Sequence, residues 1–146
     1  MSTSLLKGHC VCGAVQFSAT PAELDYHACH CSTCRRWSAG PFLGIQVGAS
    51  LDVEDESELA TYRSSEWAER QFCRNCGTPL FYKLVGLDHT VVAVEAFDDT
   101  SGFHFARQIF VDEKPAHYDF ANPTLMQTGA EVFAAFEAAQ REARHV

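Results

Sequence analysis

Three short stretches hold all seven cysteines of this chain: Cys10-Val-Cys12, Cys29-His-Cys31-Ser-Thr-Cys34 and Cys73-Arg-Asn-Cys76. The two outer stretches supply two sulfurs each, and the middle stretch supplies three. Four sulfurs form a closed tetrahedral zinc site, whereas three leave one position of the metal open to a substrate. This difference predicts one structural zinc and one catalytic zinc.

The two outer pairs fit a structural site. Zinc binds cysteine sulfur at about 2.3 Å, and two turns that each supply a pair of sulfurs meet its tetrahedral preference. The chain between the pairs forms one long loop that the metal closes, which stabilises the fold as a cross-link does. We therefore predict a structural zinc at Cys10, Cys12, Cys73 and Cys76, against the alternative that these are ordinary thiols.

The middle stretch fits an open site. We expect its three sulfurs to come from one tight loop, so that Cys29, Cys31 and Cys34 hold a second zinc. A metal with three thiolates favours a further thiol as its ligand and displaces the thiol proton. Two alternatives stay open: a redox Cys31-Ser-Thr-Cys34 motif, or His30 as a fourth ligand that closes the site.

Composition narrows the class of protein. The chain has 146 residues, 47% of them hydrophobic, and we expect one domain with a hydrophobic core. Its net charge is -8, which disfavours binding to nucleic acid or to an anionic membrane. No stretch resembles a signal peptide or a membrane span, so we expect a cytoplasmic location. In that reducing compartment, paired cysteines are more often metal ligands than disulfides.

Hydrophobic patterning predicts a mainly β chain with one late helix. The pair of strands around Cys73 and Cys76 reads as a hairpin, and the glycine that follows permits the positive φ of a tight turn. Strands are predicted at residues 14–18, 42–47, 68–72, 79–83, 90–94 and 103–111.

The C-terminal segment is predicted as a helix from Gly129 to Arg144. Thr128 and Glu131 have the spacing of a capping box, in which each side chain binds the backbone amide of the other residue. Val132, Phe133 and Phe136 follow at helical spacing, and we expect this stripe to pack in the core rather than to bind a ligand.

Four segments resemble the glutathione-dependent formaldehyde-activating enzyme (GFA) family: residues 8–13, 29–35, 72–80 and 109–115, the last followed by Tyr118-Asp119. The similarity runs from about Gly8 to Phe120. It implies a β-rich, Mss4-like fold of small antiparallel sheets, two zinc ions, and carbon–sulfur lyase activity on S-hydroxymethylglutathione. The expected partners are glutathione or a related thiol, and formaldehyde or a related aldehyde. Carried over residue by residue, the resemblance assigns the same two groups of cysteines to the structural and the catalytic zinc.

Three positions depart from the family pattern. Gln108 precedes Ile109 where members usually have histidine, His117 stands where tryptophan is common, and Glu95-Ala-Phe-Asp-Asp99 replaces Gly-x-Leu-Asp-Asp. None of these changes removes a cysteine. They bear on the substrate rather than on the metals.

Candidate substrate residues lie next to the cysteines. Arg35 and Arg36 follow Cys34 directly and are candidates for binding a glutathione carboxylate, although a solvated face is an equal alternative. His30 is a candidate catalytic residue, and either His30 or His117 is a candidate proton donor.

A zinc-stabilised protein-binding module is the competing function, because the same scaffold acts through protein contacts alone and the related centromere protein V works at chromatin. The acidic charge disfavours direct DNA binding. An open three-thiolate cluster has no evident use in a pure binding module, so we favour an enzyme.

Overall fold

The computed structural model describes residues 3–144 and confirms a mainly β fold with two sheets and a C-terminal helix. The described chain forms two compact units, residues 3–26 with 43–104 and residues 27–42 with 105–144. The prediction of a single domain stays a prediction. No helix within the described residues is long and apolar enough to cross a membrane.

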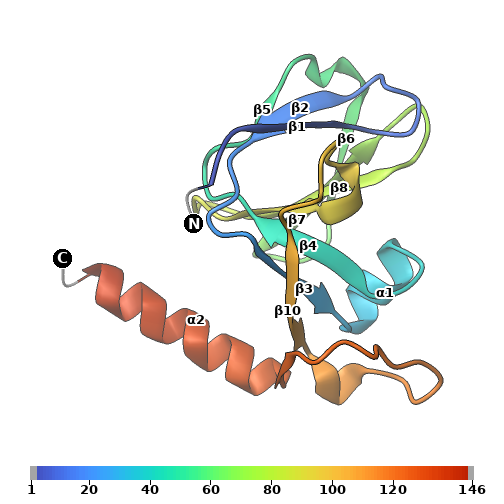
Figure 1. The fold of residues 1–146 in the computed structure, drawn as a ribbon. Coiled ribbons are helices and arrows are strands. Elements are labelled where there is room, and N and C mark those ends of the chain that lie inside the picture. The colour runs from blue at the N-terminus through green and yellow to red at the C-terminus, as the bar shows by residue number, and fades with distance from the viewer. Residues whose placement is uncertain (1–2, 145–146) are drawn as a thin grey trace. The chain divides into compact units, whose positions relative to one another are not determined.

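The first unit contains a small sheet and a longer run of strands (Figure 1). The small sheet has the order β1-β2-β5 and is antiparallel throughout. In the longer run the order is β4-β9-β8-β7-β6, again with antiparallel neighbours. The strands are β1 (Leu6–His9), β2 (Gln16–Ala19), β4 (Phe42–Gln46), β5 (Asp52–Val53), β6 (Leu59–Arg63), β7 (Ala68–Cys73), β8 (Pro79–Leu84) and β9 (Thr90–Ala93). Two short 3₁₀ helices are Glu56–Glu58, before β6, and Val94–Ala96, after β9.

The predicted hairpin around the third cysteine pair is confirmed. β7 ends at Cys73, β8 begins at Pro79, and the two strands pair antiparallel. Gly77 has φ +82, which is the left-handed conformation that glycine adopts without steric cost. Its backbone N–H donates to the Cys73 carbonyl at 2.8 Å, which closes the turn. The hairpin thus places both cysteines at one end of a two-stranded ribbon.

The core of the first unit lies between its two groups of strands. Phe17 of β2 meets Phe81 of β8 edge to face at 5.1 Å and Phe97 at 5.4 Å between ring centroids, and all three rings are buried. Cys10 and Cys73 belong to the same buried cluster. Two of the four outer cysteines are therefore anchored by apolar packing as well as by their turns.

The second unit carries the middle cysteines and both α-helices. β3 (Asp25–Cys29) enters it from the first unit, and within it β10 (His104–Ile109) lies between β3 and β11 (Leu125–Gln127). β10 and β11 are parallel. The helices are α1 (Ser32–Trp37) and α2 (Gly129–Arg144), with a 3₁₀ turn at Val111–Glu113.

Helix α2, red in Figure 1, begins and ends where the sequence predicted. The capping box forms: the Thr128 amide donates to Glu131 at 2.9 Å, and the Glu131 amide donates to the Thr128 hydroxyl at 3.2 Å. The expectation of a core-packed stripe is wrong for Phe133, which contacts Phe110 but remains 53% exposed. A capping signal fixes where a helix begins, but it does not determine how much of its apolar face is covered.

Candidate metal centres

The outer cysteine pairs come together in the first unit. The sulfurs of Cys10, Cys12, Cys73 and Cys76 lie within 4.8 Å of one another. Cys10 Sγ is 3.6 Å from Cys12 Sγ, and Cys12 Sγ is 3.8 Å from Cys73 Sγ. A tetrahedron with metal–sulfur bonds of about 2.3 Å has edges of about 3.8 Å. The spacing of the sulfurs therefore fits a four-thiolate zinc site.

Hydrogen bonds to sulfur prepare this cluster for a cation. Backbone N–H groups donate to two of the sulfurs, Val15 N to Cys10 at 3.3 Å and Cys76 N to Cys73 at 3.4 Å. The Asn75 amide donates to Cys12 Sγ at 3.2 Å. Such donors stabilise a thiolate over a thiol. The motif predicted the cysteines, but the role of Asn75 is visible only once Cys12 lies beside it.

The pKa values of two of these thiols are shifted in opposite directions. The Thr78 hydroxyl, 3.1 Å from Cys76 Sγ, lowers the pKa of Cys76 to about 5. Burial raises the pKa of Cys73 to about 11. The cluster therefore combines a surface sulfur that ionises readily with a buried sulfur that ionises only beside a cation.

The middle cysteines come together in the second unit, with sulfurs again within 4.8 Å of one another. Cys29 is the last residue of β3, Cys31 caps the N-terminus of α1, and Cys34 lies inside that helix. The Cys34 amide donates to Cys31 Sγ at 3.4 Å. The expected tight loop is in fact a strand end followed by a short helix, whose first turn brings Cys31 and Cys34 onto one side.

The three thiols crowd one another strongly. Cys29 and Cys34 are buried, and Cys31 is half-buried. Hydrogen bonds with Cys31 and Cys34, together with burial, raise the pKa of Cys29 far above its ordinary value. Three sulfurs at this spacing cannot all ionise without a compensating cation, so the donor set fits a soft divalent metal. All seven cysteines are free thiols in the described part of the chain.

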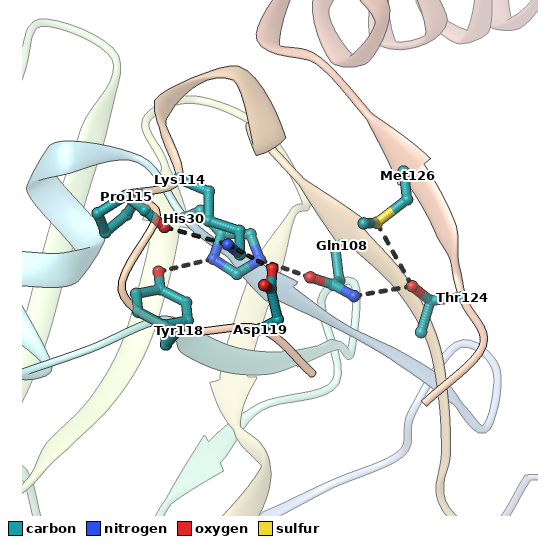
Figure 2. Close-up of polar contacts among 8 residues, drawn as sticks. All are labelled: His30, Gln108, Lys114, Pro115, Tyr118, Asp119, Thr124 and Met126. Atoms are coloured by element: carbon teal, nitrogen blue, oxygen red, sulfur yellow. Dashed lines mark hydrogen bonds and ion pairs between the residues drawn. The ribbon is translucent and has the colours of Figure 1, made fainter. Parts of the chain in front are cut away.

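The His30 side chain lies between Tyr118 and Gln108 in the second unit (Figure 2). Its side chain is completely buried. Nδ1 is 2.8 Å from the Tyr118 hydroxyl, and Nε2 is 2.8 Å from Gln108 Oε1. Burial lowers the pKa of His30. Because both ring nitrogens are already engaged, this arrangement disfavours His30 as a fourth metal ligand.

The other predicted substrate residues surround the middle cluster unequally. Arg35 is half-buried, and its Nε donates to the His30 carbonyl at 2.8 Å. Arg36, the next residue of α1, is exposed. His117 is also exposed and lies against Tyr118, with 5.2 Å between ring centroids.

Residues that sequence reasoning did not select complete this part of the second unit. Gln108, which was noted only as a departure from the family, is buried and binds His30. Tyr118 stacks on the His30 ring, and Lys114 lies 5.0 Å from the centroid of the Tyr118 ring. Lys114 also forms an ion pair with Asp119 at 2.6 Å (Figure 2). Apart from that departure, no sequence pattern pointed to Gln108.

The fold and the clusters define the class: a mainly β protein with two cysteine clusters that are able to hold metal ions. The family profile described as glutathione-dependent formaldehyde-activating enzyme matches residues 5–113. An uncharacterized lyase of Schizosaccharomyces pombe is 36% identical over 127 residues, which cover 86% of this chain and 93% of that protein. This chain belongs to the glutathione-dependent formaldehyde-activating enzyme family.

Two further similarities agree with this membership. A Halomonas elongata protein named after the same family is 30% identical over 86 residues, covering 53% of this chain and 55% of that protein. The crystal structure of a Rhodobacter sphaeroides protein, a structural genomics target, matches with a TM-score of 0.56 and 26% identity over 64% of this chain and 88% of that one. At the level of the family and its names, the expectation of a lyase-type enzyme is confirmed.

Proposed function

We propose that this protein is a zinc-dependent carbon–sulfur lyase that forms and cleaves the adduct of a thiol and an aldehyde, with glutathione and formaldehyde as the first pair to test. The observation that carries the proposal is the pair of clusters with unequal ligand numbers, four sulfurs in one and three in the other. Family membership supports the same reaction class.

In this proposal Cys10, Cys12, Cys73 and Cys76 hold a structural zinc. The sulfur spacings near 3.8 Å support it, as do the N–H donors to sulfur. Cys29, Cys31 and Cys34 would hold the second zinc, which would offer a thiol a position on the metal and lower the pKa of that thiol.

The reaction requires little more than proximity and one proton transfer. In the cleavage direction the C–S bond breaks and its electron pair stays on sulfur, while the adduct hydroxyl gives its proton to water as the C=O bond forms. The protein holds sulfur and carbonyl carbon together, which raises their effective concentration. Arg35 lies on α1 one residue beyond Cys34, where a guanidinium can attract a carboxylate of glutathione.

His30 acts indirectly in this proposal. It is fully buried, and its two ring nitrogens bind Tyr118 and Gln108, so it does not reach a substrate directly. It joins the segment between Cys29 and Cys31 to β10 and to the chain around Tyr118. Loss of this connection would let the sulfurs drift from their common centre.

The test compares metal-loaded wild type with Cys31→Ser. Cys31 is chosen because it is the least buried of the three middle cysteines. NMR follows the formation of S-hydroxymethylglutathione from glutathione and formaldehyde, against the uncatalysed rate. We expect Cys31→Ser to abolish the acceleration and to lower the metal content by one ion per chain, with an unchanged far-UV circular dichroism spectrum. Equal rates in the two proteins would overturn the metal-centred mechanism.

Metal content also separates the enzyme from a binding module. Two zinc ions per chain, in protein purified under reducing conditions without chelator, agree with one closed and one open site. A single zinc ion, together with no acceleration of the glutathione reaction, would favour the binding module.

A further inference from the structure

A series of hydrogen bonds runs from Tyr118 through His30, Gln108 and Thr124 to Met126 (Figure 2). Its links measure 2.8 Å from Tyr118 to His30, 2.8 Å from His30 to Gln108, 2.9 Å from Gln108 to Thr124 and 3.7 Å from Thr124 to Met126 Sδ. All its members belong to the second unit.

The contact between Thr124 and Met126 determines which group donates in each hydrogen bond of the series. A thioether sulfur only accepts, so the Thr124 hydroxyl donates its single hydrogen to Met126. Thr124 Oγ1 then accepts from Gln108 Nε2, which leaves Gln108 Oε1 facing His30 as an acceptor. His30 therefore carries its proton on Nε2.

The same reasoning assigns the donor in the hydrogen bond between Tyr118 and His30. With the His30 proton on Nε2, Nδ1 is an acceptor, and the Tyr118 hydroxyl donates its one hydrogen to it at 2.8 Å. The hydroxyl oxygen keeps its lone pairs, and within the described residues it has no second polar partner. Tyr118 thus presents an acceptor, and its donor capacity is used internally.

One hydrogen bond joins the Tyr118 oxygen to the residue that connects two of the middle cysteines. His30, its hydrogen-bond partner, lies between Cys29 and Cys31 in the chain, and the Tyr118 side chain is half-buried rather than enclosed. Burial raises the pKa of Tyr118, so the phenol stays neutral at pH 7 and keeps the hydrogen that it donates to His30. Stacking on His30 and the Lys114 cation at 5.0 Å hold the ring in place.

We propose that the Tyr118 hydroxyl oxygen accepts a hydrogen bond from the hydroxyl group of the thiol–aldehyde adduct, and that His30 and Gln108 are positioning residues that fix its direction. The inference rests on the proposed function and adds to it the residue that recognises the adduct. The adduct bears a hydroxyl on the carbon next to sulfur, whereas the free thiol and a simple thioether bear none. Tyr118 therefore distinguishes the adduct from both.

A binding and kinetic comparison tests the contact. Metal-loaded wild type, Tyr118→Phe and the control Tyr62→Phe, whose ring is exposed on β6, are compared for cleavage of S-hydroxymethylglutathione and for inhibition by S-methylglutathione, which lacks the hydroxyl. Loss of one neutral hydrogen bond lowers kcat/KM for the adduct about three- to tenfold in Tyr118→Phe. The inhibition constant of S-methylglutathione stays at its wild-type value, and Tyr62→Phe behaves as wild type.

The results distinguish failure of this inference from failure of the proposed function. An equal loss for adduct and thioether would make Tyr118 a purely structural residue and overturn the inference, as would no loss at all. Wild type that fails to cleave the adduct would instead overturn the proposed function.

A second measurement tests the positioning chain without any substrate. Side-chain ¹⁵N NMR of His30 is expected to show the Nε2–H tautomer in wild type and in Tyr118→Phe, and loss of this single tautomer in Gln108→Leu. With an Nδ1–H tautomer in wild type, His30 would donate to the Tyr118 oxygen, and the Tyr118 hydrogen would be free to donate to the adduct. That result would overturn the inference.

Discussion

Removal of one sulfur from each outer pair, Cys12→Ser together with Cys76→Ser, is predicted to destabilise the whole fold. These two cysteines are exposed, whereas Cys10 and Cys73 are buried in the core, so the double change adds no hydroxyl to the interior. Two sulfurs remain, which is too few for a closed zinc site.

The size of the effect follows from the loop that the metal closes. Cys12 and Cys73 are 61 positions apart. A cross-link over that length stabilises a protein by about 4 kcal/mol in the chain-entropy treatment. The middle cluster closes only the six residues from Cys29 to Cys34, for which the same treatment gives about 2 kcal/mol. A domain is stable by about 5–15 kcal/mol in total, so loss of the outer site leaves little stability.

Urea unfolding followed by circular dichroism, with metal content measured on the same samples, provides the assay. We expect the double variant to lose one metal ion and about 4 kcal/mol of unfolding free energy. The control, Cys31→Ser, loses one ion and no more than about 2 kcal/mol. A double variant with the wild-type unfolding midpoint and full metal content would refute the assignment of these cysteines to a structural site.

Three further predictions concern other parts of the chain. Arg35→Ala raises KM for glutathione more than it lowers kcat, and exceeds the effect of Arg36→Ala; an unchanged KM would return Arg35 to a solvated role. Gly8→Ala loses about 1–3 kcal/mol of stability in thermal unfolding, because a Cβ there would overlap the Ala96 carbonyl and the Phe17 ring, and an unchanged Tm would contradict that packing. Thr128→Ala costs about 1 kcal/mol and speeds amide hydrogen exchange in the first turn of α2, whereas Thr128→Ser keeps the cap; equal exchange in the two variants would show that the capping box contributes nothing.

Local patterns predicted the local structure well. The hairpin that carries Cys73, the turn at Gly77 and the capping box of α2 depend on residues close together in the chain, and all three were confirmed. The strands at β4 and β9 were also found nearly where alternation and apolar runs placed them.

Elements with weak local signals were missed. β1, β3, β5, β6 and β11 were not predicted, because none of them has the apolar, β-branched run that marks β9. Helix α1 has six residues, and metal-ligand spacing concealed it because Cys31-Ser-Thr-Cys34 fits a loop equally well. The exposure of Phe133 was missed for a different reason: helical spacing shows that a stripe exists but not what covers it.

The sequence by itself determined the family, the mainly β class and the grouping of the cysteines, because ligand spacing and turn residues are properties of short segments. Only the tertiary structure decided which way His30 points and what surrounds it. Tyr118 and Gln108 lie 88 and 78 positions from His30, and no local pattern encodes a contact over that distance. The direction of the hydrogen-bond chain depends further on Thr124 and Met126, since each donor is assigned only when the next acceptor is known. The sequence therefore identified the sulfur atoms that are able to hold metal. Tertiary packing determined that Tyr118 and Gln108 orient His30, the residue between two of these cysteines.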